Sequence, residues 1–98
     1  MFVRIVKMTF QQDKTADFLA HFNTHKLNIR AFKGCQFLEL YQDKENPAVF
    51  FTYSYWDTTT DLDVYRASTL FKEVWKTTKN WFAAKPEAWS VNKLETLN

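Results

Sequence analysis

The hydrophobic pattern of the chain centres on the stretch Val49–Trp56, which is dense in aromatic and β-branched residues and contains neither glycine nor proline. This composition is typical of a β-strand. Alternate side chains of a strand point to opposite faces. One face carries Val49, Phe51, Tyr53 and Tyr55, and the other carries Phe50, Thr52, Ser54 and Trp56. Because both faces carry large apolar groups, the pattern predicts a strand in the middle of a sheet with cover on each side.

Similar runs predict three more strands, over residues 2–10, 35–42 and 89–97. The turn at 43–47 folds the second strand back onto Val49–Trp56 as a hairpin. The last two strands are separated by residues whose apolar positions recur at helical spacing.

Helical spacing covers residues 15–32 and about 62–85. We expect Asp13 or Thr15 to cap the first helix, and Gly34 to supply the left-handed turn after it. The second helix is expected to break at residues 67–69 and to end before Pro86, which disfavours helical geometry in the residue before it.

The resulting order, β-α-β-β-α-β, predicts an α+β fold of the ferredoxin-like type. Residues 1–98 would form a single domain, a four-stranded antiparallel sheet with two helices on one face. The opposite face keeps the large aromatic groups of the central strand, and an exposed apolar patch of this kind usually marks an interface. We therefore expect a homodimer in which two sheets face each other as a dimeric α+β barrel.

Composition narrows the functional classes. The chain has 98 residues, 46% hydrophobic and 18% aromatic, with a formal net charge of +2. These values favour a packed globular protein and argue against a nucleic-acid or membrane surface. We expect no signal peptide, because charges interrupt the apolar N-terminus and no small-residue cleavage site follows it. The single Cys35, expected to be a small buried side chain, fits a cytoplasmic location.

Two segments resemble a known family. Residues 34–43, Pro47 and residues 50–57 are similar to the hairpin of the antibiotic biosynthesis monooxygenase family. The following helix of that family carries residue types that are matched here by Leu62, Tyr65, Ser68 and Phe71. The resemblance implies a ferredoxin-like fold and a dimeric barrel. Some family members oxidise aromatic or quinol substrates with O₂ and without metal or flavin, some degrade haem, and many have no known activity.

The chain departs from the family pattern at two positions. Family members often have histidine where Tyr65 and Leu70 stand. The haem-degrading relatives use an asparagine on the first strand and a histidine on the second helix, and neither is present. Haem degradation is therefore the weaker expectation.

Candidate site residues lie on several predicted elements. His25, on the apolar stripe of the first helix, is the candidate base facing a pocket between helices and sheet. Tyr53 and Tyr65 could position a substrate oxygen, while Trp56 and Trp75 could flank a flat ring. Thr78, on the stripe of the second helix, completes the predicted substrate contacts. The alternative for all of these side chains is an ordinary place in the core.

Two further groups of side chains, a histidine pair and the arginines, have structural explanations as well as functional ones. His21 and His25 have the spacing of a helical metal pair, but no further ligands follow at a recognised spacing, so we expect no metal and no cofactor. Arg4 and Arg66 are the cationic candidates. Arg4 alternates with apolar residues on the first strand, and we expect it to form an ion pair with a partner such as Glu39 or Glu95 rather than an anion site.

The leading hypothesis is a cofactor-independent monooxygenase acting on a small aromatic or quinol-type substrate with O₂. The alternative is a non-catalytic dimeric barrel that binds a small hydrophobic ligand or a partner protein. A cavity lined by His25, Tyr65 and Trp75 would favour the enzyme, whereas a filled core would favour the alternative.

Overall fold

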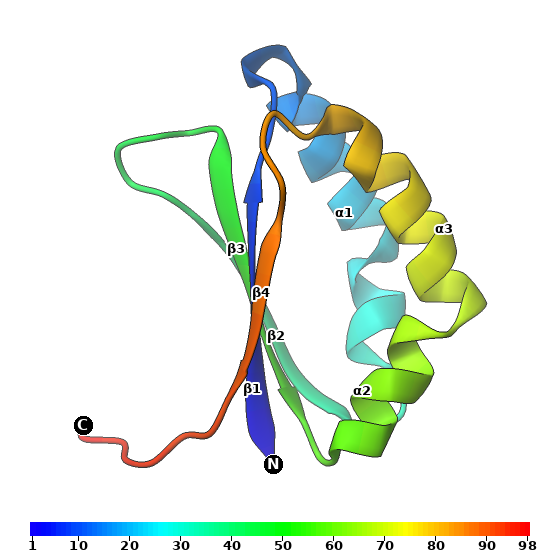
Figure 1. Cartoon of the computed structure of the whole chain (residues 1–98), viewed down its shortest axis with the longest axis vertical. Coiled ribbons are helices and arrows are strands. Elements are labelled where there is room, and N and C mark those ends of the chain that lie inside the picture. The colour runs from blue at the N-terminus through cyan, green and yellow to red at the C-terminus, as the bar shows by residue number, and fades with distance from the viewer.

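The computed structural model describes residues 1–98 as one sheet covered by helices on one face (Figure 1). The elements in chain order are β1 (Phe2–Thr9), a 3₁₀ turn (Gln12–Lys14), α1 (Thr15–Arg30), β2 (Cys35–Gln42), β3 (Val49–Trp56), α2 (Thr59–Arg66), α3 (Thr69–Thr78), a second 3₁₀ turn (Lys79–Trp81) and β4 (Glu87–Val91). None of the helices is both long and apolar enough to cross a membrane.

The strand order in the sheet is β2-β3-β1-β4, and every neighbouring pair is antiparallel. The predicted ferredoxin-like topology is therefore confirmed, with β3 in the interior of the sheet as its two-sided apolar pattern requires. The pairing of β1 with β3 places Arg4 opposite Ser54 and Met8 opposite Phe50. These pairs belong to the inner face of the sheet, which the helices cover.

The core lies between this inner face and the helices. One cluster joins strands and α1 through Met8, Phe10, Phe18 and Phe50. A second, nearer the start of β2, contains Cys35, Trp56 and Leu62. Cys35 is 3% exposed, which confirms its expected place as a small buried side chain.

The helix ends show how local chemistry sets the elements. The break predicted at 67–69 separates α2 from α3, because the Ser68 Oγ accepts a hydrogen bond from the Phe71 backbone N–H at 3.1 Å and starts a new helix. The cap predicted for α1 was wrong: Lys14 occupies the N-cap position and no side chain bonds to the first turn. The preceding 3₁₀ turn already leads the chain into the helix.

Gly34 follows α1 with φ of +88°, so the predicted left-handed turn is confirmed. A β-carbon at this position would lie 2.4 Å from the Asp61 Cβ. The turn and α2 therefore pack closely enough to require glycine.

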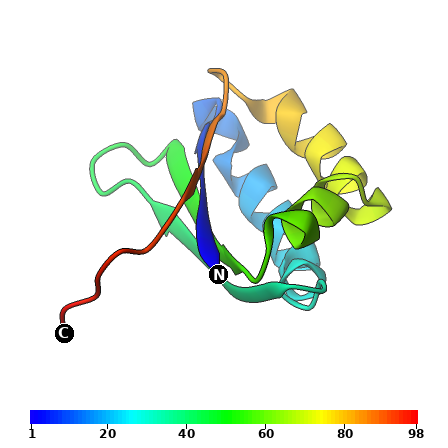
Figure 2. The same cartoon turned by 60° about the horizontal axis from the view of Figure 1, so that its bottom comes forward.

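The last strand is shorter than predicted. It pairs with β1 only over Glu87–Val91, and residues 92–98 form no regular structure. Figure 2 shows this segment leaving the body of the molecule. Leu94 and Leu97, expected in the strand, are 93% and 85% exposed.

The other face of the sheet, called here the outer face, has no helix over it (Figure 1). It carries Ile5, Phe37, Tyr41, Phe51, Tyr53, Tyr55, Trp89 and Val91. The rings of Phe37 and Tyr55 stack with centroids 4.4 Å apart. Tyr41 and Trp89 are 44% and 43% exposed, so the chain alone leaves part of this aromatic surface in contact with water.

Candidate active site between the helices and the sheet

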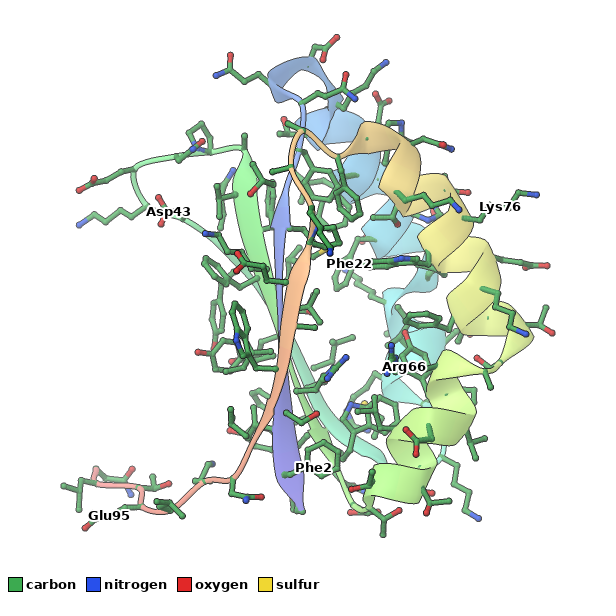
Figure 3. The ribbon with its side chains drawn as sticks, in the orientation of Figure 1. Phe2, Phe22, Asp43, Arg66, Lys76 and Glu95 are labelled. Atoms are coloured by element: carbon green, nitrogen blue, oxygen red, sulfur yellow. The ribbon has the colours of Figure 1, made fainter.

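A cavity of about 250 Å³ lies between the inner face of the sheet and the helices. Its walls are mostly apolar, with 13 hydrophobic residues among the 20 that line it. The sheet contributes Arg4, Val6, Met8, Leu38, Thr52, Ser54, Trp56, Glu87 and Ala88, and Pro86 lies just before β4. The helices contribute Phe18, Phe22, Ile29, Leu62, Tyr65, Arg66, Phe71, Val74, Trp75 and Thr78. Figure 3 shows Phe22 in this space between the two layers. Concave apolar sites with a few polar groups are typical of small-molecule binding.

One wall of the cavity is a stacked aromatic pair. The rings of Trp56 and Tyr65 have centroids 5.0 Å apart and an interplanar angle of 29°. The Trp56 indole N–H donates to the Ser54 Oγ at 2.9 Å, and Trp56 is only 1% exposed. The indole is thus fixed by packing and by its hydrogen bond, so it backs the wall of the cavity with almost no open surface and offers no free donor.

Tyr65 offers a polar group in this apolar wall. Its ring is held edge to face against Phe32 and Phe71, each at a centroid distance of 5.2 Å. Its hydroxyl forms no hydrogen bond within the chain. Burial and, to a smaller extent, the neighbouring Cys35 raise the pKa of Tyr65 well above its usual value. The phenol therefore stays protonated at physiological pH and can donate a hydrogen bond to a ligand.

The predicted contacts on α3 also line the cavity. Trp75 stacks on Phe71 with a centroid distance of 5.7 Å and an interplanar angle of 12°. Thr78 is 2% exposed, and its hydroxyl donates to the Val74 carbonyl oxygen at 2.7 Å. Because that donor is already used within the helix, Thr78 contributes wall surface rather than a free hydrogen-bond donor.

His25 does not line the cavity, contrary to its expected placement. Its ring lies 4.7 Å from that of His21, whose Nε2 is 3.1 Å from the Val74 carbonyl oxygen and whose ring is 5.6 Å from Trp81. The histidine pair is therefore packed beside α3 and the turn that follows it. Helical periodicity defines a broad apolar stripe but cannot say which part of the stripe reaches the cavity.

Tyr53 was expected in the pocket but lies on the outer face of the sheet. It stands opposite Ile5 in β1 and Glu39 in β2, and its ring is 5.1 Å from that of Tyr41. The pleat explains this position, because Tyr53 and Trp56 are three residues apart and so point to opposite faces. The alternation in the sequence was sufficient to separate them.

The two cationic candidates of the sequence, Arg4 and Arg66, both line the cavity, although an anion site was the lesser expectation for them. Arg4 projects from β1, and its Nη1 donates to the Ser90 Oγ at 3.0 Å. Arg66 is the last residue of α2. The ion pair expected for Arg4 is wrong, because Glu39 lies on the outer face, where it accepts a hydrogen bond from Tyr41, and Glu95 lies in the C-terminal segment. Burial and then the positive charge of Arg66 lower the pKa of Arg4.

No three histidine, cysteine, aspartate or glutamate side chains gather in the structure as a metal site would require. The His21 and His25 pair accordingly has no third side chain of these types beside it. The polar side chains in the cavity lining include Arg4, Ser54, Tyr65, Arg66 and Glu87.

Comparison with protein families matches residues 1–77 to the family described as antibiotic biosynthesis monooxygenase. The match includes β1 to nearly the end of α3, and so contains most of the cavity lining. No curated protein matches the chain.

Several solved structures share the fold. A conserved protein from Methanosarcina mazei is 22% identical, with a TM-score of 0.88 over 95% of this chain and 93% of that one. A protein from Nitrosomonas europaea, provisionally named as an antibiotic biosynthesis monooxygenase, is 20% identical. Its TM-score is 0.89, and the alignment covers 97% of this chain and 100% of that one. Another structure, named as an antibiotic biosynthesis monooxygenase, is 15% identical. Its TM-score is 0.90, and the alignment covers 97% of this chain and 100% of that one. At these identities the likeness concerns the fold alone.

Proposed function

Because the chain belongs to the antibiotic biosynthesis monooxygenase family, we propose that it is a cofactor-independent monooxygenase that oxidises a small aromatic or quinol-type substrate with O₂. The observation that carries this proposal is the apolar cavity with Trp56, Tyr65 and Trp75 in its walls. A flat ring fits such walls, since aromatic groups gain from stacked and edge-to-face contacts.

The proposed division of roles follows the geometry of the walls. Trp75 and Tyr65 contact the ring of the substrate, Trp56 and Thr78 support the wall from behind, and the protonated Tyr65 hydroxyl donates to a substrate oxygen. The electrons that reduce O₂ come from the substrate, so the protein contributes orientation and exclusion of water. His25 lies outside the cavity lining, so it does not contact the substrate in this scheme.

We further propose that two copies of the chain pair through their outer faces, giving the dimeric barrel expected from the sequence. The exposed aromatic surface around Tyr41, Tyr53 and Trp89 supports this arrangement, because burying apolar area stabilises an interface by about 25 cal/mol per Å². The single buried Cys35 supports a cytoplasmic location.

The test is O₂ consumption with a panel of quinols and phenols, together with identification of the oxidised product. Trp75→Leu removes a cavity wall, and the matched control Trp89→Leu removes a tryptophan from the outer face. We expect substrate-dependent O₂ uptake that falls at least about tenfold in Trp75→Leu and changes little in Trp89→Leu, if dimerisation is retained. Sedimentation checks that both variants keep the assembly state of the wild-type chain, and equal losses of O₂ uptake in two variants that do so would contradict a role for this cavity.

A second candidate function is ligand binding without catalysis. It is favoured by the absence of histidine from the cavity lining and by the position of the one lining carboxylate, Glu87, whose Oε2 is 3.9 Å from the Lys7 Nζ. Native mass spectrometry of the purified protein distinguishes the two. A retained aromatic ligand combined with no O₂ uptake for any panel member would support binding alone.

A further inference from the structure

Two guanidinium groups line the same cavity from opposite layers. Arg4 belongs to the inner face of the sheet, directly opposite Ser54 in β3. Arg66 comes from the end of α2, and Figure 3 shows it between the helices and the sheet. Tyr65 precedes Arg66 in the chain, and Ser54, which lies opposite Arg4, accepts the hydrogen bond from the Trp56 indole. The two positive charges are therefore adjacent to the surface on which a ring would stack.

No carboxylate neutralises these charges. The ion pair between Lys7 and Glu87, at 3.9 Å, is the one side-chain pair within 4.0 Å in the structure. Arg4 donates only to the neutral Ser90 hydroxyl, and the Arg66 side chain forms no hydrogen bond within the chain. Glu87 borders the cavity, but its carboxylate is turned toward Lys7. Arg4 therefore has guanidinium donors beyond its bond to Ser90, and the exposed Arg66 side chain has donors that are open to solvent at the rim of the same cavity.

The two arginines also repel each other. The pKa of Arg4 is lowered by burial and by the charge of Arg66, which means that the pair is close enough to interact. Guanidinium groups nevertheless remain charged in proteins. An anion bound between them would relieve the repulsion and satisfy the free donors, and charge-assisted hydrogen bonds of this type are among the strong ones.

We propose that Arg4 and Arg66 form an anion-binding end of the cavity, and that its ligand is an aromatic molecule carrying an oxyanion, either a carboxylate or an ionised phenol. The inference rests on the proposed function, because it names the charge of the ring that the aromatic wall would hold. The proposal also explains how a phenol could ionise in a cavity that has no histidine to act as a base. Two guanidinium groups favour the ionised form of a bound phenol, so the phenol proton can leave to water as the phenol binds.

Calorimetric titration with naphthoate and with its neutral analogue naphthamide tests the proposal. Both offer the same ring, so the difference in affinity reports the charge. We expect naphthoate to bind at least about tenfold more tightly than naphthamide, as charge-assisted hydrogen bonds predict. Arg66→Gln should remove about that factor for naphthoate and leave naphthamide unchanged.

The matched control is Lys76→Gln, which removes one positive charge from the outer side of α3 (Figure 3). It should leave both affinities unchanged. Arg4→Gln should act like Arg66→Gln. If its circular dichroism shows that it does not fold, Arg4→Lys replaces it and should weaken naphthoate alone, because an ammonium lacks the planar fork of a guanidinium.

Equal affinities for naphthoate and naphthamide would overturn the anion site while leaving the aromatic cavity in place. An equal loss of naphthoate affinity in Arg66→Gln and Lys76→Gln would also overturn it. If neither ligand binds, the aromatic cavity of the proposed function fails, and the anion site fails with it.

Naphthol distinguishes the two sources of the oxyanion. In water at neutral pH a phenol is protonated, so an absorbance spectrum of naphtholate in the complex would assign the anion to an ionised phenol. Neutral bound naphthol, together with tight naphthoate binding, would assign it to a carboxylate. Either spectrum accompanied by the loss in Arg66→Gln supports the site.

Discussion

The Tyr65 ring lies over the Trp56 indole with centroids 5.0 Å apart, and this contact joins α2 to the central strand β3. The stack places the Tyr65 hydroxyl in a largely apolar wall of the cavity that Arg4 and Arg66 also line. Helix, sheet and cavity are therefore connected through one pair of aromatic side chains.

Tyr65→Phe should keep this stack and remove the donor. We expect the affinity for a bound phenol or quinone to fall by about three- to tenfold, the usual effect of one neutral hydrogen bond, with little change in the free energy of unfolding. Because the pKa of Tyr65 is raised, the wild-type affinity should not depend on ionisation of this group between about pH 6 and 9. Fluorescence titration measures both effects. Tyr41→Phe removes a hydroxyl from the outer face, and an equal loss of affinity there would contradict the role of Tyr65.

Ser54→Ala should destabilise the fold although serine is small. It leaves the buried Trp56 indole N–H without its acceptor, which costs about 1–3 kcal/mol. Urea unfolding gives the free-energy change. In the double variant with Trp56→Phe, which lacks the N–H, the added cost of Ser54→Ala should largely disappear. Full additivity would mean that the hydrogen bond contributes nothing.

Gly34→Ala should lower the free energy of unfolding for two separate reasons. The φ of +88° costs about 1–2 kcal/mol for a residue with a β-carbon, and the new Cβ would lie 2.4 Å from the Asp61 Cβ. Thermal and urea unfolding measure the total. Repeating the substitution in Asp61→Gly removes the contact and leaves the backbone term. The same cost in both backgrounds would show that Asp61 moves aside freely.

Tyr53→Lys tests the proposed pairing of outer faces. A charge buried at the centre of an apolar interface is costly without a partner. We therefore expect the wild-type chain to be a dimer and the Tyr53→Lys variant to be a monomer. Sedimentation equilibrium at several concentrations measures the assembly. The control is Val64→Lys, which alters an apolar residue 56% exposed on α2 and should preserve the dimer. A monomeric wild-type chain would remove the interface altogether.

Cys35 should make stability depend on alkaline pH. Burial raises the pKa of its thiol above that of an exposed cysteine, which is the value in the unfolded chain. The folded chain therefore binds more protons than the unfolded chain above about pH 9, and the free energy of unfolding falls as pH rises. A difference of one bound proton, that of the Cys35 thiol, changes the free energy of unfolding by at most about 1.4 kcal/mol per pH unit. Urea unfolding from about pH 8 to 10 measures it, and Cys35→Val should show a smaller slope. Identical slopes would exclude the thiol.

The sequence determined the elements and their order, because strand alternation, helical spacing and Gly34 act over a few residues. It also identified β3 as the interior strand from the apolar groups on both of its faces, and Ser68 as part of a helix break. It overestimated the last strand, since the pattern continues after Val91 while pairing with β1 ends there. Pairing depends on the partner strand, which local pattern does not contain.

The site was decided by tertiary structure. Local pattern named Trp56, Tyr65, Trp75 and Thr78, but only packing of helices on the sheet brings them around one cavity. The same packing places His25 outside the cavity. It also leaves Arg4 without the ion pair expected from its strand position, because neutralisation of a charge depends on distances between residues far apart in the chain. The sequence thus identified the two arginines as positively charged groups, and the fold placed both of them at the same cavity.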